Sequence, residues 1–249
     1  MTSLIRTCHK ALLSVGLVTL TAGASAIPLT IPTTHLDAEA IYRFDPDTAS
    51  LMDTLGISAR ALGNSRAVAG SNWQFMMPIT QVTLNASIIP IGLQPVSGFA
   101  SGSGLMIQSE NGALTLANFG LDFKRNVLTA DLGTSAGISK AFDVYNFTVD
   151  KGLHVSTSGG LSMAMNLSNM MLTGAAQNQF ASALQLDELA VAVLPMLNLG
   201  SLDVDIAAGL RFGVSDRAMT AAIPEPPRFA TLGLGLLGLV FLARRRMAY

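Results

Sequence analysis

Few side chains in this sequence are of the types that carry out metal or thiol chemistry. Outside the first 26 residues the histidines are His35 and His154, which stand far apart and lack a second ligand-type residue at metal-site spacing. We therefore expect structural or exposed histidines and no metal site. The single cysteine, Cys8, falls in an N-terminal segment that we expect to be removed. The mature chain is thus predicted to hold neither a disulfide nor a cysteine nucleophile.

The residue patterns of common hydrolases are not found either. A serine hydrolase needs Gly-x-Ser-x-Gly, and the nearest approach, residues 98–102, has Ala100 at the nucleophile position. No lysine follows the glycine-rich stretches at the spacing of a phosphate loop. Glycoside hydrolysis needs two carboxylates across a cleft, and no pair stands out among Asp131, Asp143, Asp150, Asp203 and Asp205. We predict no catalytic residue and no cofactor.

Composition narrows the class of partner. Charged residues make up 12% of the chain, about half of the roughly 25% of an ordinary soluble protein, and the net charge of −1 gives no field that attracts phosphate backbones. Nucleic acid is therefore not expected as a partner. Aromatic platforms for sugars are scarce, with Trp73, Tyr42 and Tyr145 in the body, so we expect no deep aromatic cleft of the lectin type.

The body that would position these residues is predicted to be mainly β, an antiparallel sandwich or a barrel-like sheet with one or two short helices. Apolar and small polar residues alternate from Ile79 to Ile88, as in a half-buried strand. Turn sequences such as Asn111-Gly112 separate the segments at the short spacing of an antiparallel sheet. Further strands are predicted at 104–108, 113–123, 127–132, 141–149, 153–157, 161–167 and 202–212.

Two helices interrupt the strand pattern. Asp47 is a plausible N-cap, and apolar residues recur at roughly helical spacing from Thr48 to Leu62, where Gly63-Asn64 would end the helix. A second helix is predicted from Ala175 to Leu186. The apolar run Leu189–Leu199 contains Pro195 and is too short to span a bilayer, so we expect a buried connection or a short strand.

The first 26 residues have the parts of a secretory signal peptide. Arg6 and Lys10 precede an apolar helix at 11–23, and small residues, Ala24 and Ala26, stand where a signal peptidase reads the chain. An apolar helix of about 13 residues is only about 20 Å long, against about 30 Å for the hydrocarbon core. We therefore predict cleavage after Ala26 rather than a permanent anchor.

The end of the chain has three parts in a fixed order. Pro224, Glu225 and Pro226 come first, and prolines keep a segment extended and out of helix or sheet. A short apolar helix predicted at 229–243 follows, long enough to act as a marginal membrane anchor. Arg244, Arg245 and Arg246 close the pattern. Because arginines are retained on the cytoplasmic side, they orient the body to the periplasmic side of the inner membrane.

This order resembles the PEP-CTERM tail, the sorting signal that exosortases recognise in Gram-negative bacteria that make exopolysaccharide. The resemblance covers the tail, residues 223–249. It implies that an exosortase-type membrane peptidase cuts near Pro224 to Pro226 and that the body reaches the cell surface or the extracellular matrix, with exopolysaccharide as a further partner. It implies no activity for the body.

The expected organisation is a signal peptide at 1–26, an exported β-rich domain at 27–222 and the PEP-CTERM tail at 223–249. The expected function is that of a non-catalytic surface or matrix protein. One alternative is a permanently tail-anchored envelope protein. In that case the β domain would act on polysaccharide or bind a small ligand.

Overall fold

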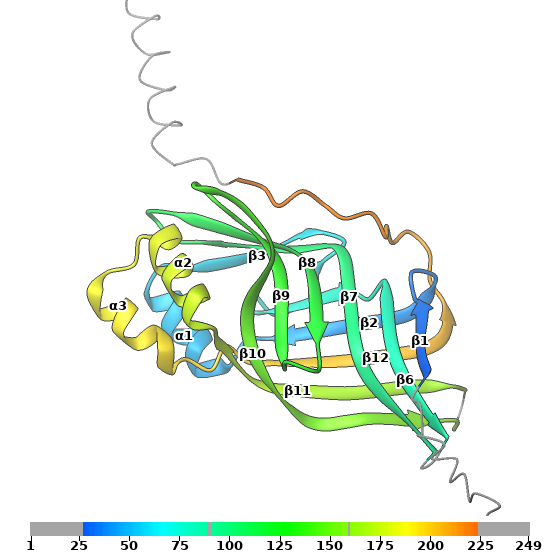
Figure 1. The fold of residues 1–249 in the computed structure, drawn as a ribbon. Coiled ribbons are helices and arrows are strands. Elements are labelled where there is room, and N and C mark those ends of the chain that lie inside the picture. Colours follow the sequence, from blue (N-terminus) through cyan, green and yellow to red (C-terminus); the bar gives the residue numbers. More distant parts are fainter. Residues whose placement is uncertain (1–26, 89–90, 159, 224–249) are drawn as a thin grey trace, which may run out of the picture.

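The computed structural model describes residues 27–88, 91–158 and 160–223 (Figure 1). The predicted signal peptide, with Ala24 and Ala26, lies outside these residues. So do the motif Pro224–Pro226, the predicted apolar helix at 229–243 and Arg244–Arg246. Within the described ranges, no helix combines the length and the hydropathy that a membrane crossing requires.

The described residues form twelve strands and three short helices. The strands are β1 (Ile27–Pro32), β2 (Leu36–Arg43), β3 (Ser58–Gly63), β4 (Arg66–Ala67), β5 (Gln74–Pro78), β6 (Gln81–Ile88), β7 (Ile91–Gln108), β8 (Ala113–Asp122), β9 (Val127–Thr134), β10 (Gly137–Ser156), β11 (Ser162–Leu172) and β12 (Ser201–Leu210). The helices are α1 (Pro46–Thr54), α2 (Gly174–Leu184) and α3 (Glu188–Val193), and a 3₁₀ turn, η1 (Leu194–Met196), follows α3.

All strands belong to one antiparallel sheet that curls into a half-barrel (Figure 1). Its order is β1-β6-β7-β8-β9-β10-β11-β12-β2-β5-β4, and β3 pairs with β7 off this path. The curl follows from the segment 74–88. Its first half, β5, pairs with β2, and its second half, β6, pairs with β7, so one stretch of chain lies near both ends of the order.

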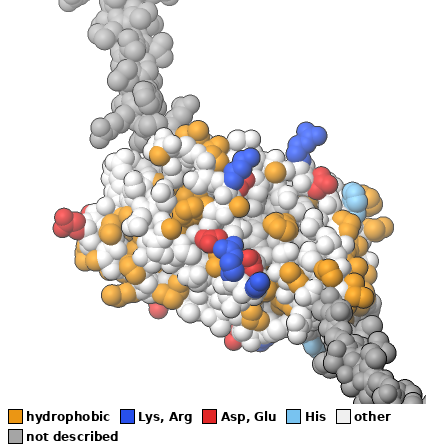
Figure 2. Space-filling model, in the orientation of Figure 1, with side chains coloured by type: hydrophobic (Ala, Val, Ile, Leu, Met, Phe, Trp, Pro, Cys, Tyr) orange, Lys and Arg blue, Asp and Glu red, His pale blue; other side chains and the backbone are white. Residues whose placement is uncertain are grey.

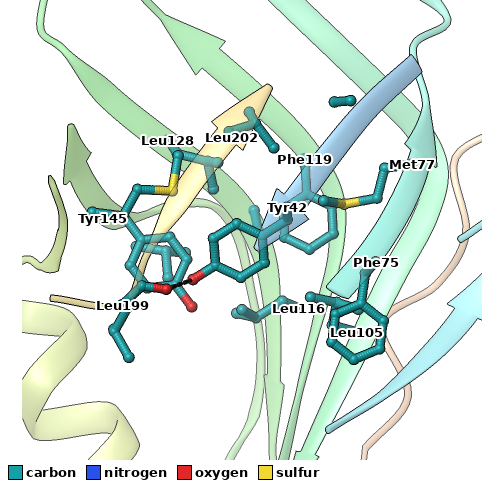
Figure 3. Packing of buried hydrophobic residues seen from close by; sticks show 14 of the residues in the cluster. Tyr42, Phe75, Met77, Leu105, Leu116, Phe119, Leu128, Tyr145, Leu199 and Leu202 are labelled. Carbon is teal, nitrogen blue, oxygen red and sulfur yellow. Dashed lines mark hydrogen bonds between the residues drawn. The ribbon is translucent and has the colours of Figure 1, made fainter. Parts of the chain in front are cut away.

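Alternation of side chains produces the core. In β2, Ala38, Ala40 and Tyr42 are buried, as expected for a strand with one face inward. Leu105, Leu116 and other inward side chains join them in a single cluster inside the curl (Figure 3). The helices gather at one end of the half-barrel, opposite the tips of the β6–β7 and β10–β11 hairpins (Figure 1).

The predicted antiparallel, mainly β body is confirmed, and three of its helical predictions need correction. The structure has three short helices rather than one or two. The helix predicted from Thr48 to Leu62 ends at Thr54, because Gly56 takes a positive φ of 65° and Ser58–Gly63 pair with β7 instead. Its N-cap is Asp45, whose carboxylate accepts from the amides of Asp47 and Thr48.

Of the remaining helix and strand predictions, one is confirmed and others need correction. The helix predicted at Ala175–Leu186 is confirmed as α2. The prediction of a buried connection or short strand at Leu189–Leu199 is wrong, because this run begins within helix α3. Asp187 caps that helix by accepting from the amide of Ala190 at 2.8 Å. The strands predicted at 141–149 and 153–157 are one long strand, β10, since its pairing with β11 resumes at His154 after a register shift that follows Lys151.

Candidate functional site

After β12 the chain leaves the sheet. Residues 211–223, which we call the C-terminal strap, form neither helix nor strand and run along one side of the half-barrel (Figure 1). The strap passes over β3, β7, β8 and β9, since its atoms lie beside Gly63, Gly102, Asn118 and Gly133. In the sequence it lies between β12 and the predicted sorting motif.

Arg211 fastens the start of the strap. Its guanidinium donates to the carbonyls of Ala38, of Thr33 at 3.2 Å and of Ile79 at 2.8 Å. These carbonyls belong to the turn between β1 and β2, to β2 and to the β5–β6 bend, so one side chain ties three segments. Partial burial lowers the pKa of Arg211, but the ordinary value is so high that the group stays charged at neutral pH.

Two asparagines hold the middle of the strap. Asn64 donates through Nδ2 to the carbonyl of Ser215 at 2.7 Å. Asn118 binds Met219 twice, because its Oδ1 accepts from the Met219 amide at 2.9 Å and its Nδ2 donates to the Met219 carbonyl at 2.7 Å. These side-chain amides thereby supply hydrogen bonds to the strap backbone that a neighbouring strand would otherwise supply.

Asn118 also organises the sheet beneath the strap. Its Oδ1 accepts from the Gly102 amide at 3.0 Å, and its Nδ2 donates to Asp131 at 2.8 Å. The other oxygen of Asp131 accepts from the amide of Ala141 at 2.9 Å. Gly102, Asn118 and Ala141 all have positive φ angles, 73°, 53° and 48°, and register shifts occur at each of them. Asp131 therefore stabilises a row of bulges.

Glycines allow the strap to lie close. A Cβ at Gly102 would meet the carbonyl oxygens of Arg217 at 2.9 Å and Ser215 at 3.2 Å, and a Cβ at Gly133 would meet that of Ala222 at 2.5 Å. The last described contacts of the strap are made by Ala221, which is 2% exposed, and by Ala222. Ile223 is 53% exposed, and Pro224 follows it in the sequence.

The other candidate carboxylates do not come together in a cleft. Asp143 and Asp122 flank Arg125 at 2.8 and 2.7 Å in an exposed ion pair, and hydrogen bonding to Arg125 lowers the pKa of Asp122. Asp203 pairs with Arg43 and accepts from Asn166. None of the five aspartates considered in the sequence, among which no pair stood out, lines any of the hollows described below.

The predicted histidines and tyrosines can be placed as well. His35, in the turn between β1 and β2, and His154, in β10, are both exposed, and no three metal-binding side chains converge anywhere in the described ranges. Tyr42 and Tyr145 are buried in the core with ring centroids 6.1 Å apart, and the Tyr42 hydroxyl donates to the carbonyl of Leu199 at 2.8 Å (Figure 3). Burial raises the pKa of both hydroxyls, so neither ring is a surface platform.

Hollows of different character lie in and around the half-barrel. A cavity of about 50 Å³ inside the curl is lined almost wholly by apolar side chains such as Met163, Phe119 and Leu121. A second, about 180 Å³, lies between the helices and the sheet and is also apolar. A third, about 260 Å³, lies beside Trp73 and is lined by polar and apolar groups together. Charged side chains are few on the face shown in Figure 2, where several of both signs adjoin one another near its centre.

Sequence reasoning missed the residues that fasten the strap. Asn64 was interpreted as part of a helix stop, and Asn118 lies inside an alternating strand pattern that gives no sign of a bulge. Arg211 follows the last strand with no recognisable motif. For Asn118 the one available signal is weak, namely that asparagine tolerates positive φ.

Comparison with known proteins adds little. No family model matches the chain, and no curated protein matches it. Among solved structures, the crystal structure of the heme-binding protein HtaB from Corynebacterium glutamicum is similar at a TM-score of 0.40 and 9% sequence identity, over 74% of this chain and 98% of that one. A likeness of this degree gives no information about what this chain binds.

Proposed function

We propose that this chain is an exported, non-catalytic protein of the cell surface or extracellular matrix, sorted through its PEP-CTERM-like tail. The observation that carries the proposal is where the strap ends. Its last contacts with the body involve Ala221 and Ala222, Ile223 is exposed, and the predicted motif begins at Pro224. Among the described residues, the last C-terminal attachments of the body thus come before the residues that a sorting peptidase would need.

The attachment is compatible with cleavage beyond it. Arg211, Asn64 and Asn118 hold the strap at positions 211, 215 and 219, so a cut between Pro224 and Pro226 leaves every described contact in the body. Prolines at 224 and 226 lack the amide hydrogens that a sheet would require. A peptidase embedded in the membrane would meet this segment next to the apolar helix predicted at 229–243.

The proposed export route uses the signals at both ends of the chain. A signal peptidase would cut after Ala26, and β1 begins at Ile27. The body would then be held at the periplasmic side of the inner membrane, with Arg244–Arg246 in the cytoplasm, until an exosortase-type peptidase released or transferred it.

Epitope tags test this route. One tag is placed after Ala26 and one after Tyr249, in cells with and without a working exosortase. We expect the mature chain to lose the C-terminal tag only when the exosortase is present, and Glu225→Ala to block that loss. Pro227→Ala, just outside the motif, is the matched control and should be processed normally. Retention of the C-terminal tag in exosortase-positive cells would reject the proposal.

One observation favours the alternative of a tail-anchored, ligand-binding domain. The hollow of about 180 Å³ between the helices and the sheet is lined by apolar side chains, among them Leu51, Phe180 and Leu197, which suits a small apolar ligand. In that case both tags would stay on one membrane-bound chain, so the same experiment separates the two functions.

A further inference from the structure

A groove lies where the sheet leaves an edge open. The seam groove, as we name it, is the hollow of about 260 Å³ between β3 and β5, and its walls come from α1, β3, β4, β5 and the loop before β5. β3 pairs with β7 along one edge, and no strand of the described ranges pairs along its other edge. Small side chains at Ala59, Ala61 and Ala67 leave the space open.

Trp73 is held in a fixed position at this groove. Its indole nitrogen donates to Asp53 at 3.0 Å, its ring packs edge-on against Phe44 with centroids 5.0 Å apart, and its carbonyl accepts from the Phe44 amide at 3.0 Å. A half-buried ring fixed by one hydrogen bond and one ring contact, on an anchored backbone, offers a flat apolar surface and loses little side-chain freedom on binding.

Polar side chains line the same groove as the ring. Asp53 uses one carboxylate oxygen for Trp73. Arg60 donates to the sulfur of Met106 and pairs with no carboxylate of the described residues. Asn72 is exposed, and its side-chain amide has no hydrogen-bond partner within the described residues. The groove thus presents one free carboxylate oxygen, the guanidinium N–H groups of Arg60 that do not point at Met106, and a side-chain amide that can both donate and accept.

The open edge of β3 adds backbone groups. The backbone amide of Asn64 donates to the carbonyl of Gly102. In the same register, Arg60 lies opposite Met106. Because an antiparallel strand bonds its partner through alternate residues, the N–H and C=O groups of Ala59 and Ala61 face away from β7. Both residues line the groove.

We propose that the seam groove binds sugar units of an uncharged polysaccharide. An apolar sugar face would lie against Trp73, and hydroxyls would meet Asp53, Arg60, Asn72 and the edge of β3. The carboxylate and the guanidinium cancel in charge, so the groove does not favour an acidic polymer. An extended peptide is a poorer fit, because only Ala59 and Ala61 offer free edge groups. The proposal specifies a partner for the matrix role above but does not depend on tail cleavage.

Trp73 is the sole tryptophan of the chain, so its fluorescence reports on this groove alone. The full-length chain is purified in a detergent without a sugar headgroup and titrated with neutral cello-, malto- and mannohexaose, with an alginate hexamer, and with an unrelated extended peptide. We expect a saturable change in fluorescence with at least one neutral hexasaccharide. Arg60→Gln and Asn72→Ala should each weaken it about tenfold.

Arg66→Gln is the matched control. Arg66 is exposed, contacts the sulfur of Met76 as Arg60 contacts that of Met106, and does not line the groove. The affinity of the Arg66→Gln variant for the hexasaccharide should therefore stay unchanged. No saturable response to any neutral hexasaccharide overturns the proposal, as does equal affinity in all three variants. A response to alginate or the peptide alone would replace the uncharged glycan with that class of ligand. None of these outcomes bears on tail processing, which the tag experiment measures separately.

Discussion

The two ends of the body are attached in different ways. The N-terminal end is β1, which pairs with β6 through its backbone from Ile27 to Pro32, and whose Ile27 and Leu29 are 59% and 49% exposed. The C-terminal end is the strap, which has no strand partner and depends on side chains of Arg211, Asn64 and Asn118. A backbone ladder tolerates changes of side chain, whereas a strap held by a few side chains is sensitive to single substitutions.

The largest effect is expected at Asn118. Asn118→Ala removes four side-chain hydrogen bonds and places alanine at a φ of 53°, so the free energy of unfolding should fall by about 4 kcal/mol. Denaturant unfolding of the full-length chain in detergent measures it. Asn118→Gly relieves the backbone strain and should recover about 1 kcal/mol. A loss below about 1 kcal/mol in the alanine variant would mean that the strap is held elsewhere.

Arg211 comes next. Arg211→Leu leaves the carbonyls of Thr33, Ala38 and Ile79 without this donor, which should cost about 2.5 kcal/mol in the same unfolding measurement. Arg217 is the matched control, because it lies on the exposed strap and its guanidinium has no partner among the described residues. Arg217→Leu should change stability by less than about 0.5 kcal/mol. Equal losses in the two variants would contradict the anchoring role of Arg211.

A third substitution loosens only the end of the strap. Gly133→Ala places a Cβ within 2.5 Å of the Ala222 carbonyl oxygen, so residues 220–223 must move while β9 remains paired. We expect a loss of about 1 kcal/mol and faster amide hydrogen exchange in these residues. Gly152→Ala, where a Cβ meets nothing within 4 Å, should leave exchange there unchanged. Unaltered exchange in the Gly133 variant would show that the strap does not lie against β9.

The smallest effect is expected at the N-terminal end. Leu29→Thr changes a half-exposed side chain on β1 but keeps its pairing with Leu84, so stability should change by less than about 0.5 kcal/mol. Thermal unfolding is sufficient to test this. A loss above about 1.5 kcal/mol would mean that β1 is held by side-chain packing, and the contrast between the two ends would disappear.

The sequence predicted strands best where alternation was regular and flanked by turns. The predictions at 113–123 and 127–132 are close to β8 and β9, because the turn sequence Asn111-Gly112 and the alternating residues after it both indicate antiparallel strands. Residues 27–52 contain prolines and mixed patterns, and β1 and β2 were missed there. Their pairing partners, β6 and β12, are distant in sequence, so no local pattern could identify them.

The errors near α1 and at the strap have the same physical origin. Ile57, Ala59 and Leu62 fit a helical spacing as well as a strand, and pairing with β7 decides between them. The strap has no periodicity, and its course depends on Asn118, which a bulge in a distant strand brings into place. The predicted motif residues Pro224, Glu225 and Pro226 lie outside the described residues and stay a prediction.

We propose that the chain is cut directly after the strap. The most direct measurement is the intact mass of the mature protein isolated from exosortase-positive cells. We expect an N-terminus at Ile27 and a C-terminus between Ile223 and Pro226, with any added group appearing as extra mass on that species. A mature protein whose mass includes Arg244–Arg246 and Tyr249 would contradict it.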